Sequence, residues 1–519
     1  MSPNTIPATT LSAGAPTRLL GVSQPISTDF PSPKDLQRTQ DLLEALKTSG
    51  SFEPATESKT RVHVLARMNQ LVKRWMQALT KARIPNGESV NAGGKLIAFG
   101  SYRLNVHSTG SDIDTLVVAP RHVHRSDFFS SFKDMLVGDK HCKDVVAVEN
   151  AFVPIITCNY GGIELDLLFA QLDLPTIPEN LDLSDDALLK NLDQESIRSL
   201  NGARVAEQLL KLVPNQEAFC TTLRAIKKWA KAKGIYSNAF GFFGGITWAI
   251  LTARACQLYP NATPARLVQK VFFVFATWKW PSPVLLQHLS PATGSSLDSL
   301  VWNPMVNYTD RLHLMPILTP AYPEQNSTHN VSTSTLKVIK EELKLGLDIA
   351  NKIHKGECKW EDLFEERNFF TGYKHFVALT LDAPAESTYN GFFESKIRQL
   401  VQILERNPLV ATAHVNPKRF EKSGSVWFIG LEFIEHAKNL DLTSDIERFK
   451  RNIAHQAQKV KNLGEGSFDV VYVKRSELIK YVKAADLKRG KAKEVVVVKP
   501  ADSRKRVATS DAPDAKRNC

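Results

Sequence analysis

The sequence predicts an α+β chain made of several domains. At 519 residues it is too long for one hydrophobic core, and this length favours two to four domains. A strand-rich segment (95–172) is followed by a helical one (201–349), and strand patterns return after residue 350. We therefore expect an α/β domain, a central helical domain and a small C-terminal α/β sandwich.

Composition sets broad limits on the function. Residues 1–33 are rich in Ser, Thr and Pro with no long apolar run, so we expect them to be disordered and not a secretory signal. No segment approaches the roughly 20 apolar residues that span a bilayer. The net charge of +12 fits a polyanionic partner, although a solubilising surface would give the same value. The six scattered cysteines fit reduced thiols in the nucleus or cytosol.

Two neighbouring motifs are the most informative part of the expected α/β domain, residues 34–200. Phe99-Gly100-Ser101 predicts a tight turn whose backbone N–H groups can face a phosphate. Asp112-Ile113-Asp114 then begins an apolar strand, and alternation directs both carboxylates to the same face. A divalent cation relieves the repulsion between such carboxylates. Together the motifs predict a metal site that carries a nucleotide, whereas either motif alone also fits a plain turn or a solvated strand edge.

A third acidic ligand is expected from the strand Ile163–Phe169. Its apolar residues alternate with Glu164 and Asp166, which share the opposite face, and Gly161-Gly162 predicts a hairpin turn before it. Alternation does not choose between the two acids, and a solvated strand face is the alternative for both.

Helical periodicity precedes and follows this strand-rich segment. Two helices are expected before it, Asp35 to Thr48 and Val62 to Ala82. In the helical domain, residues 201–349, there are two apolar stripes: Val205, Leu209, Leu212 and Val213, then Phe219, Leu223, Ile226 and Ala230. Gly234 is expected to cap the second stripe, and the Pro-rich stretch 280–323 to pack as an ordered loop.

Residues 350–485 are expected to form a third domain. Strands at 375–381, 409–415 and 427–433 and an amphipathic helix from Glu394 to Asn407 give a β-α-β-β order like an RNA-recognition motif. The aromatic RNA-binding signature of that fold is absent. The tail, residues 486–519, carries two basic clusters, 488–493 and 503–506, which suit nuclear import or an electrostatic arm for RNA; a solvated tail is the alternative.

An ordered series of short motifs runs from Phe99 to about Tyr322. They are Gly100-Ser101-Tyr102-Arg103-Leu104, Gly110-Ser111-Asp112-Ile113-Asp114, Ile163-Glu164-Leu165-Asp166, Arg198-Ser199-Leu200-Asn201-Gly202, Leu223-Arg224-Ala225-Ile226-Lys227, Ile235-Tyr236-Ser237-Asn238, Gly244-Gly245-Ile246-Thr247-Trp248 and His313–Pro323. With this series the chain resembles the eukaryotic nuclear poly(A) polymerases of the DNA polymerase β-like nucleotidyltransferase superfamily. Asn105 departs from the pattern, because the family commonly has Gly there.

The resemblance implies specific roles for residues of this site. Asp112, Asp114 and Asp166 would be the catalytic, metal-binding triad, and the first helix would pack with the central domain. Asn201, expected at a helix start, would lie near the nucleotide sugar, with a plain helix cap as the alternative. The implied nucleotide-binding residues are Phe99, Gly100, Ser101, Asn201, Lys227, Lys231, Tyr236, Gly245, Ile246 and Thr319.

The implied function is template-independent transfer of AMP from ATP to RNA 3′ ends, as in mRNA polyadenylation, by a polynucleotide adenylyltransferase. Two Mg²⁺ (or Mn²⁺) ions would support in-line transfer with release of pyrophosphate. The expected partners are ATP, the RNA 3′ end and cleavage and polyadenylation factors. We expect a nuclear monomer that does not enter a membrane.

Two other functions remain to be distinguished. A related nucleotidyltransferase would add CCA to tRNA or would add uridines, but the motif series at 200–323 and the third domain argue against it. A catalytically inactive fold would only bind RNA or processing factors, but the three aspartates and Gly100-Ser101 argue against that.

Overall fold

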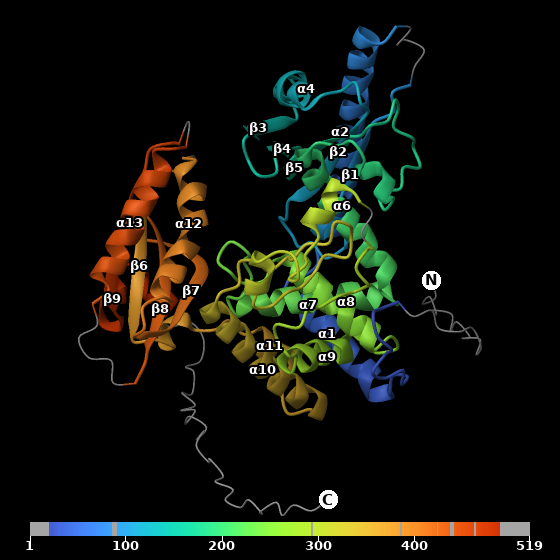
Figure 1. The fold of residues 1–519 in the computed structure, drawn as a ribbon. Coiled ribbons are helices and arrows are strands. Elements are labelled where there is room, and N and C mark those ends of the chain that lie inside the picture. Colours follow the sequence, from blue (N-terminus) through green and yellow to red (C-terminus); the bar gives the residue numbers. More distant parts are fainter. Residues whose placement is uncertain are drawn as a thin grey trace, which may run out of the picture.

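The computed structural model describes residues 20–85, 91–291, 294–384, 387–422, 424–435, 441–460 and 463–487. Figure 1 shows one sheet with its helices at the top, a group of helices below it, and a second sheet with two long helices at the left. Within these described ranges, no helix combines the length and the apolar character needed to cross a membrane.

The first domain is built on a five-stranded mixed sheet in the order β1-β2-β5-β4-β3. Only the β2–β5 pair is parallel. As predicted, β4 and β5 form a hairpin, in which Gly161 and Gly162 both have positive φ. The strands are β1 (Lys95–Ala98), β2 (Ile113–Ala119), β3 (Cys142–Val148), β4 (Ile155–Tyr160) and β5 (Ile163–Gln171).

One face of this sheet is covered by the long helix α2. Its buried Trp75 packs against Phe128, Phe132 and Phe169, which joins α2, the α4–α5 segment and β5 in one core. The helical elements of this domain are α2 (Ala55–Arg83), α3 (Gly100–Arg103), α4 (Arg125–Asp127), η1 (Phe128–Phe132), α5 (Lys133–Val137) and η2 (Asp186–Leu189).

The central domain is helical, and α1 belongs to it in space although α2 and the sheet separate it in sequence (Figure 1). Asp35 of α1 pairs with Arg266 of α9 at 3.0 Å, and Trp360 of α11 donates to the carbonyl of Arg38 at 3.1 Å. The elements are α1 (Pro33–Thr48), α6 (Gln194–Leu212), α7 (Gln216–Ala232), α8 (Gly245–Leu258), α9 (Pro264–Ala276), η3 (Ser296–Leu300), η4 (Thr309–Leu312), α10 (Thr333–Lys355) and α11 (Trp360–Phe364).

The expected disorder of residues 1–33 is wrong for residues 20–33; residues 1–19 lie outside the described residues. Arg254 and Gln257 of α8 are buried and need hydrogen-bond partners. Arg254 donates to the hydroxyl of Ser23, and Gln257 donates to the carbonyl of Leu20 at 2.9 Å. These buried side chains hold the segment against α8, and Pro33 already begins α1.

The third domain has the β-α-β-β-α-β order of an RNA-recognition motif, with an antiparallel sheet in the order β7-β8-β6-β9. The expected helix ends earlier than predicted, at Leu404. The helix α13 and the strand β9, which complete this order, were not predicted. The elements are η5 (Phe369–Thr371), β6 (His375–Asp382), α12 (Tyr389–Leu404), β7 (Val410–Glu421), β8 (Ser425–Phe433), α13 (Thr443–Ala457), β9 (Ser467–Lys474), η6 (Arg475–Lys480) and α14 (Ala484–Leu487).

Both expected internal domain boundaries fall inside helices. The boundary at 200/201 lies within α6, and that at 349/350 lies within α10, which continues to Lys355. The expected tail from residue 486 begins inside α14, and its part from 488 onward, with both basic clusters, lies outside the described residues. Helical continuity across a junction is set by packing, and composition does not reveal it.

Candidate active site

Strand pairing brings two predicted carboxylates together. In the parallel β2–β5 ladder, Asp114 lies directly opposite Asp166, and Thr115 donates to the carbonyl of Asp166 at 3.0 Å. Asp112 directly precedes β2 and is exposed, while Ile113 between the two aspartates is fully buried. The ladder therefore places Asp166, and not Glu164, opposite Asp114.

The carboxylates repel one another across this ladder. Burial, followed by the charges of Asp112 and Asp166, raises the pKa of Asp114 to about 6. Burial, followed by the charges of Asp112 and Glu164, raises the pKa of Asp166 to about 6. Half-buried carboxylates that destabilise each other in this way form a site that favours a cation.

Gly100 allows the backbone to approach Asp114 closely. Its φ is +60°, and a Cβ atom there would lie 2.1 Å from the Oδ2 atom of Asp114. The Phe99 N–H donates to the Asp114 carbonyl at 2.9 Å, which fixes the segment to β2. The expected tight turn is a single helical turn, α3, that begins at Gly100.

One cavity of about 440 Å³ collects almost all of the predicted site residues. The predicted residue Asp166 does not line it, although its ladder partner Asp114 does. The predicted residues in its wall are Phe99, Gly100, Ser101, Asp112, Asp114, Asn201, Lys227, Lys231, Tyr236, Gly245, Ile246 and Thr319. We call it the nucleotide cavity.

Cations stand opposite the carboxylates in the nucleotide cavity. Lys227 of α7 donates to the carbonyl of Val106 at 3.1 Å. Burial, then the charges of Lys231 and Arg224, lowers the pKa of Lys227 to about 8, although Asp112 and Asp114 oppose the shift. A half-buried ammonium that lies among other cations favours a polyanionic ligand.

The hydroxyl-bearing side chain of Tyr236 lines the nucleotide cavity together with these lysines. The ammonium of Lys231 lies 5.3 Å from the centre of the Tyr236 ring. Burial, followed by the charges of Asp112 and Asp114, raises the pKa of Tyr236 to about 12, so its hydroxyl stays a neutral donor. A Cβ on Gly245 would lie 2.7 Å from that hydroxyl, which explains the need for glycine at the start of α8.

The expected position of Asn201 at a helix start is wrong. Asn201 lies within α6, which begins at Gln194 and is capped by Asp193, whose carboxylate accepts from the Ser196 N–H. The helix-cap alternative for Asn201 is thereby excluded. Its Oδ1 atom is buried without a hydrogen-bond partner in the wall of the nucleotide cavity, as expected for a group that receives one from a ligand.

An apolar wall of the nucleotide cavity was not predicted as part of the site. It includes Gly202, where a Cβ would lie 2.6 Å from the Phe99 ring. The other members are Leu104, Val106, Val205, Ala206 and Leu223. Val205 and Leu223 belong to the apolar stripes that predicted core helices. Gly202, Val205 and Ala206 are spaced at i, i+3 and i+4 and therefore share one face of α6. Small residues on one helix face were the only signal in the sequence that this face lines a cavity.

The donor set at the ladder suits Mg²⁺ or Mn²⁺, because carboxylate oxygens are hard ligands and their mutual repulsion is relieved by a cation. In the described ranges, no group of three or more His, Cys, Asp or Glu side chains is close enough together to hold a metal ion, and the three predicted aspartates are no exception. Mg²⁺ at nucleotide sites characteristically uses one or two carboxylates together with substrate phosphates. The residues present therefore fit a cation that is completed by a nucleotide.

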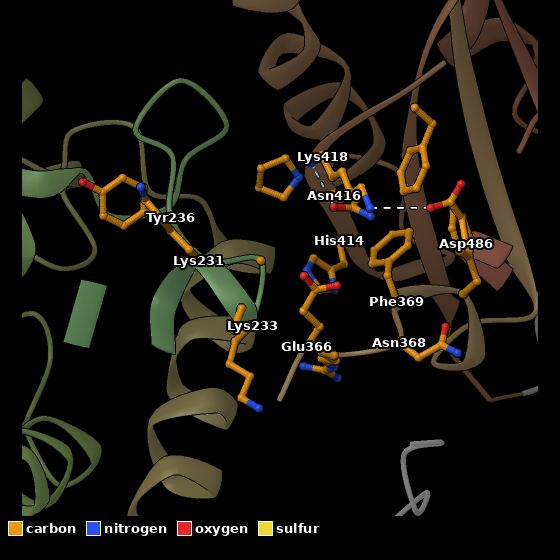
Figure 2. Close-up of a pocket in the computed structure, with 16 residues that line it drawn as sticks. Lys231, Lys233, Tyr236, Glu366, Asn368, Phe369, His414, Asn416, Lys418 and Asp486 are labelled. Carbon is orange, nitrogen blue, oxygen red and sulfur yellow. Dashed lines mark hydrogen bonds and ion pairs between the residues drawn. The ribbon is translucent and has the colours of Figure 1, made fainter. Parts of the chain in front are cut away.

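A second cavity, of about 350 Å³, lies between the central and C-terminal domains, and we call it the interdomain cavity. Figure 2 shows Lys231, Lys233 and Tyr236 on one side and His414 and Asn416 on the other. Lys231 and Tyr236 also line the nucleotide cavity, so the two spaces meet at the end of α7.

Three family models match successive parts of the chain. They describe a poly(A) polymerase nucleotidyltransferase domain at residues 21–213, a poly(A) polymerase central domain at 218–366, and a poly(A) polymerase predicted RNA binding domain at 368–426 and 423–492. Together they span most of the described residues.

Curated relatives and solved structures were also found. Poly(A) polymerase of Dictyostelium discoideum is 41% identical over 503 residues, 93% of this chain and 61% of that protein. Poly(A) polymerase PAPalpha of Candida albicans is 45% identical over 412 residues, 78% of this chain and 73% of that protein. A structure of the Cid1 poly(U) polymerase is 15% identical, with a TM-score of 0.43. The match covers 64% of this chain and 99% of that chain. By its three domain matches and these identities, the chain belongs to the poly(A) polymerase family.

Proposed function

We propose that the chain transfers AMP from ATP to the 3′ end of RNA without a template, as a polynucleotide adenylyltransferase. One observation carries the proposal. A single cavity is lined by the carboxylates of Asp112 and Asp114, by the lysines of α7 and by an apolar wall on which a base could pack. Membership of the poly(A) polymerase family supports adenosine as the added nucleotide and RNA as the acceptor.

The reaction joins the RNA 3′-oxygen to the α-phosphorus of ATP and breaks the bond between that phosphorus and the oxygen that bridges to the β-phosphate. The 3′-hydroxyl releases its proton to solvent water, and the bridging oxygen leaves with pyrophosphate. Asp112, Asp114 and Asp166 would hold two divalent cations, which supply charge that acidifies the 3′-hydroxyl and neutralises the phosphates.

The remaining residues bind and orient the nucleotide. Lys227 and Lys231 attract the β- and γ-phosphates, and the neutral Tyr236 hydroxyl donates to a phosphate oxygen. The unpartnered Asn201 oxygen would accept from a ribose hydroxyl. Ile246 and Val205, which also line the cavity, would pack on the base, and Thr319 would lie near the adenine. Catalysis then consists of positioning and charge neutralisation.

Primer extension tests this function. An oligoadenylate primer is incubated with each ribonucleoside triphosphate separately, with Mg²⁺ or with EDTA. The expected result is long extension with ATP alone and none in EDTA. Extension with UTP, or with CTP followed by ATP on a tRNA end, would indicate a different nucleotidyltransferase. Absence of pyrophosphate release with every nucleotide would indicate an inactive binding protein.

We also propose that the protein acts in the nucleus as a monomer that meets cleavage and polyadenylation factors. Two basic clusters in the sequence, 488–493 and 503–506, support nuclear import. Residues 483–519 grafted onto a cytosolic reporter should concentrate it in the nucleus, and an even distribution would contradict this.

Sedimentation of the full chain tests the proposed monomer and should give one species with the mass of 57.9 kDa.

A further inference from the structure

A third cavity, of about 340 Å³, adjoins the nucleotide cavity, with which it shares Lys227. We call it the basic cavity, because four cations and one carboxylate line it. The cations are Arg224, Lys227, Lys228 and Lys231, and the carboxylate belongs to the exposed Glu366. Hydroxyl groups from Ser49, Ser51 and Ser108 complete its polar wall.

Two of these cations, Arg224 and Lys228, form their hydrogen bonds with neutral carbonyl oxygens. Arg224 donates to the carbonyls of Ser51 and His107 at 2.6 Å each, and Lys228 donates to the carbonyl of Ser49 at 3.4 Å. Carbonyl oxygens satisfy N–H groups without cancelling a charge. Burial lowers the pKa of both Arg224 and Lys228, and for Arg224 this outweighs the opposing charges of Cys220 and Glu53.

The interdomain cavity differs in this respect. Its Arg367 forms an ion pair with the buried Glu342, and its Lys418 lies 3.6 Å from the carboxylate of Asp486, whose position Figure 2 shows. Acidic partners thus balance two cations of the interdomain cavity. An anion with several charges is therefore attracted more strongly to the basic cavity than to the interdomain cavity.

The position of the basic cavity identifies the anion. It shares Lys227, Lys231 and Val106 with the nucleotide cavity, so the two are neighbours across the phosphate-binding lysines. In an in-line transfer the leaving group departs opposite the attacking oxygen. With the β- and γ-phosphates held by Lys227 and Lys231, as in the proposed function, the leaving pyrophosphate would lie against the lysines that the two cavities share.

We propose that the basic cavity receives inorganic pyrophosphate as it leaves the nucleotide cavity. This proposal rests on the proposed adenylyl transfer. It adds a binding site and an exit side for the small product. Lys228 is the informative residue, because it lines the basic cavity and not the nucleotide cavity.

Direct binding gives a test that does not depend on turnover. Inorganic pyrophosphate is titrated into the full chain by calorimetry, without ATP or RNA, at fixed ionic strength and in EDTA. Under these conditions Asp112 and Asp114 repel the anion from the nucleotide cavity. Lys228→Gln should weaken binding about threefold to tenfold, since one charge-assisted contact is lost. Lys228→Arg should restore most of it.

The matched control is Lys344→Gln, which removes one charge from an exposed position on α10 outside the cavities described above. It should bind pyrophosphate as the wild type does. Equal weakening in Lys344→Gln and Lys228→Gln would reduce the effect to net charge and overturn the proposal. Unchanged binding in a folded Lys228→Gln variant would also overturn it.

The reaction supplies a second readout. In primer extension, Lys228→Gln should raise the inhibition constant for added pyrophosphate several-fold, by more than it changes KM for ATP. A rise in KM for the primer with unchanged inhibition by pyrophosphate would assign the basic cavity to RNA and overturn the proposal. If the wild type shows no transfer at all, the proposed function fails, while the titration still reports on the site.

Discussion

Asp114 and Asp166 are direct partners in the parallel ladder between β2 and β5. They are 52 positions apart along the chain, and a hairpin and a helical segment separate their strands. Each has its pKa raised to about 6, first by burial and then by neighbouring carboxylates. The sheet therefore holds together two groups that would separate in the absence of a cation.

Asp166→Asn is expected to lower kcat at least 100-fold, because the proposed metal site loses one of its three carboxylates. The matched control is Glu164→Gln on the same strand face, which should retain most activity. Primer extension with purified variants measures both. Loss in Glu164→Gln with retention in Asp166→Asn would reassign the third carboxylate.

The same Asp166→Asn variant should change the pH dependence of stability. Folding raises the pKa of Asp166, so between pH 4 and 6 the native state binds more protons there than the unfolded chain. The free energy of unfolding contributed by this group therefore falls as pH rises through that window. Without metal, the variant should melt above the wild type at pH 8 and lose this advantage at pH 4. A lower melting temperature at pH 8 would contradict the repulsion.

Gly100→Ala should abolish activity, because its Cβ would collide with the Asp114 carboxylate 2.1 Å away. Gly110→Ala is the matched control: Gly110 also has positive φ, +71°, but nothing lies within 4 Å of its Cβ position. Both variants carry a backbone cost of about 1 kcal/mol. Only Gly100→Ala should lose transfer, by more than 100-fold, and equal losses would mean that backbone strain alone matters.

The affinity for ATP should fall above about pH 8. Burial and neighbouring cations lower the pKa of Lys227 to about 8, so at higher pH the free protein has lost the charge that attracts the triphosphate. Lys227→Arg should retain ATP affinity to higher pH, because guanidinium stays protonated. Lys227→Met should bind ATP about tenfold more weakly, with little change across this range. Binding titrations from about pH 7 to 9.5 measure these differences.

A buried ion network supports the loop before Asp112. The fully buried Arg61 pairs with Glu53 and Glu57 at 2.8 Å each, and Glu53 also lies 2.9 Å from His107. Burial alone would raise the pKa of Glu53, but His107 and then Arg61 outweigh it and hold the pKa below its ordinary value. The ionised Glu53 carboxylate therefore stabilises the fold at neutral pH, and this stabilisation is lost as the pH falls through its lowered pKa.

Glu53→Gln should therefore cost about 1–3 kcal/mol of unfolding free energy at pH 7, because a buried cation loses one carboxylate. The difference from wild type should shrink in acid, where Glu53 of the wild type is itself protonated. Urea denaturation at both pH values measures this. A pH-independent difference would mean that shape, and not charge, accounts for the loss.

Local patterns were sufficient for the strands and helices that carry the chemistry. Alternation predicted the β5 face of Asp166, and Gly234 follows the end of α7 with φ of +69°, as expected for a cap. Asn105, where the family commonly has Gly, adopts φ of +53°, a conformation that Asn tolerates. α13 was missed because it buries only Ile446, Phe449 and Ile453 among mostly polar residues.

The sequence by itself determined which chemical groups are present and on which face of each strand they lie, because alternation and turn residues act between near neighbours. Only the tertiary structure decided that Asp114 faces Asp166, that Asn201 sits mid-helix with a buried unpaired oxygen, and that residues 20–32 pack on α8. These relationships depend on strand order and on contacts between distant segments. Burial and neighbouring charges arise only when distant segments assemble, so no local sequence pattern contains them.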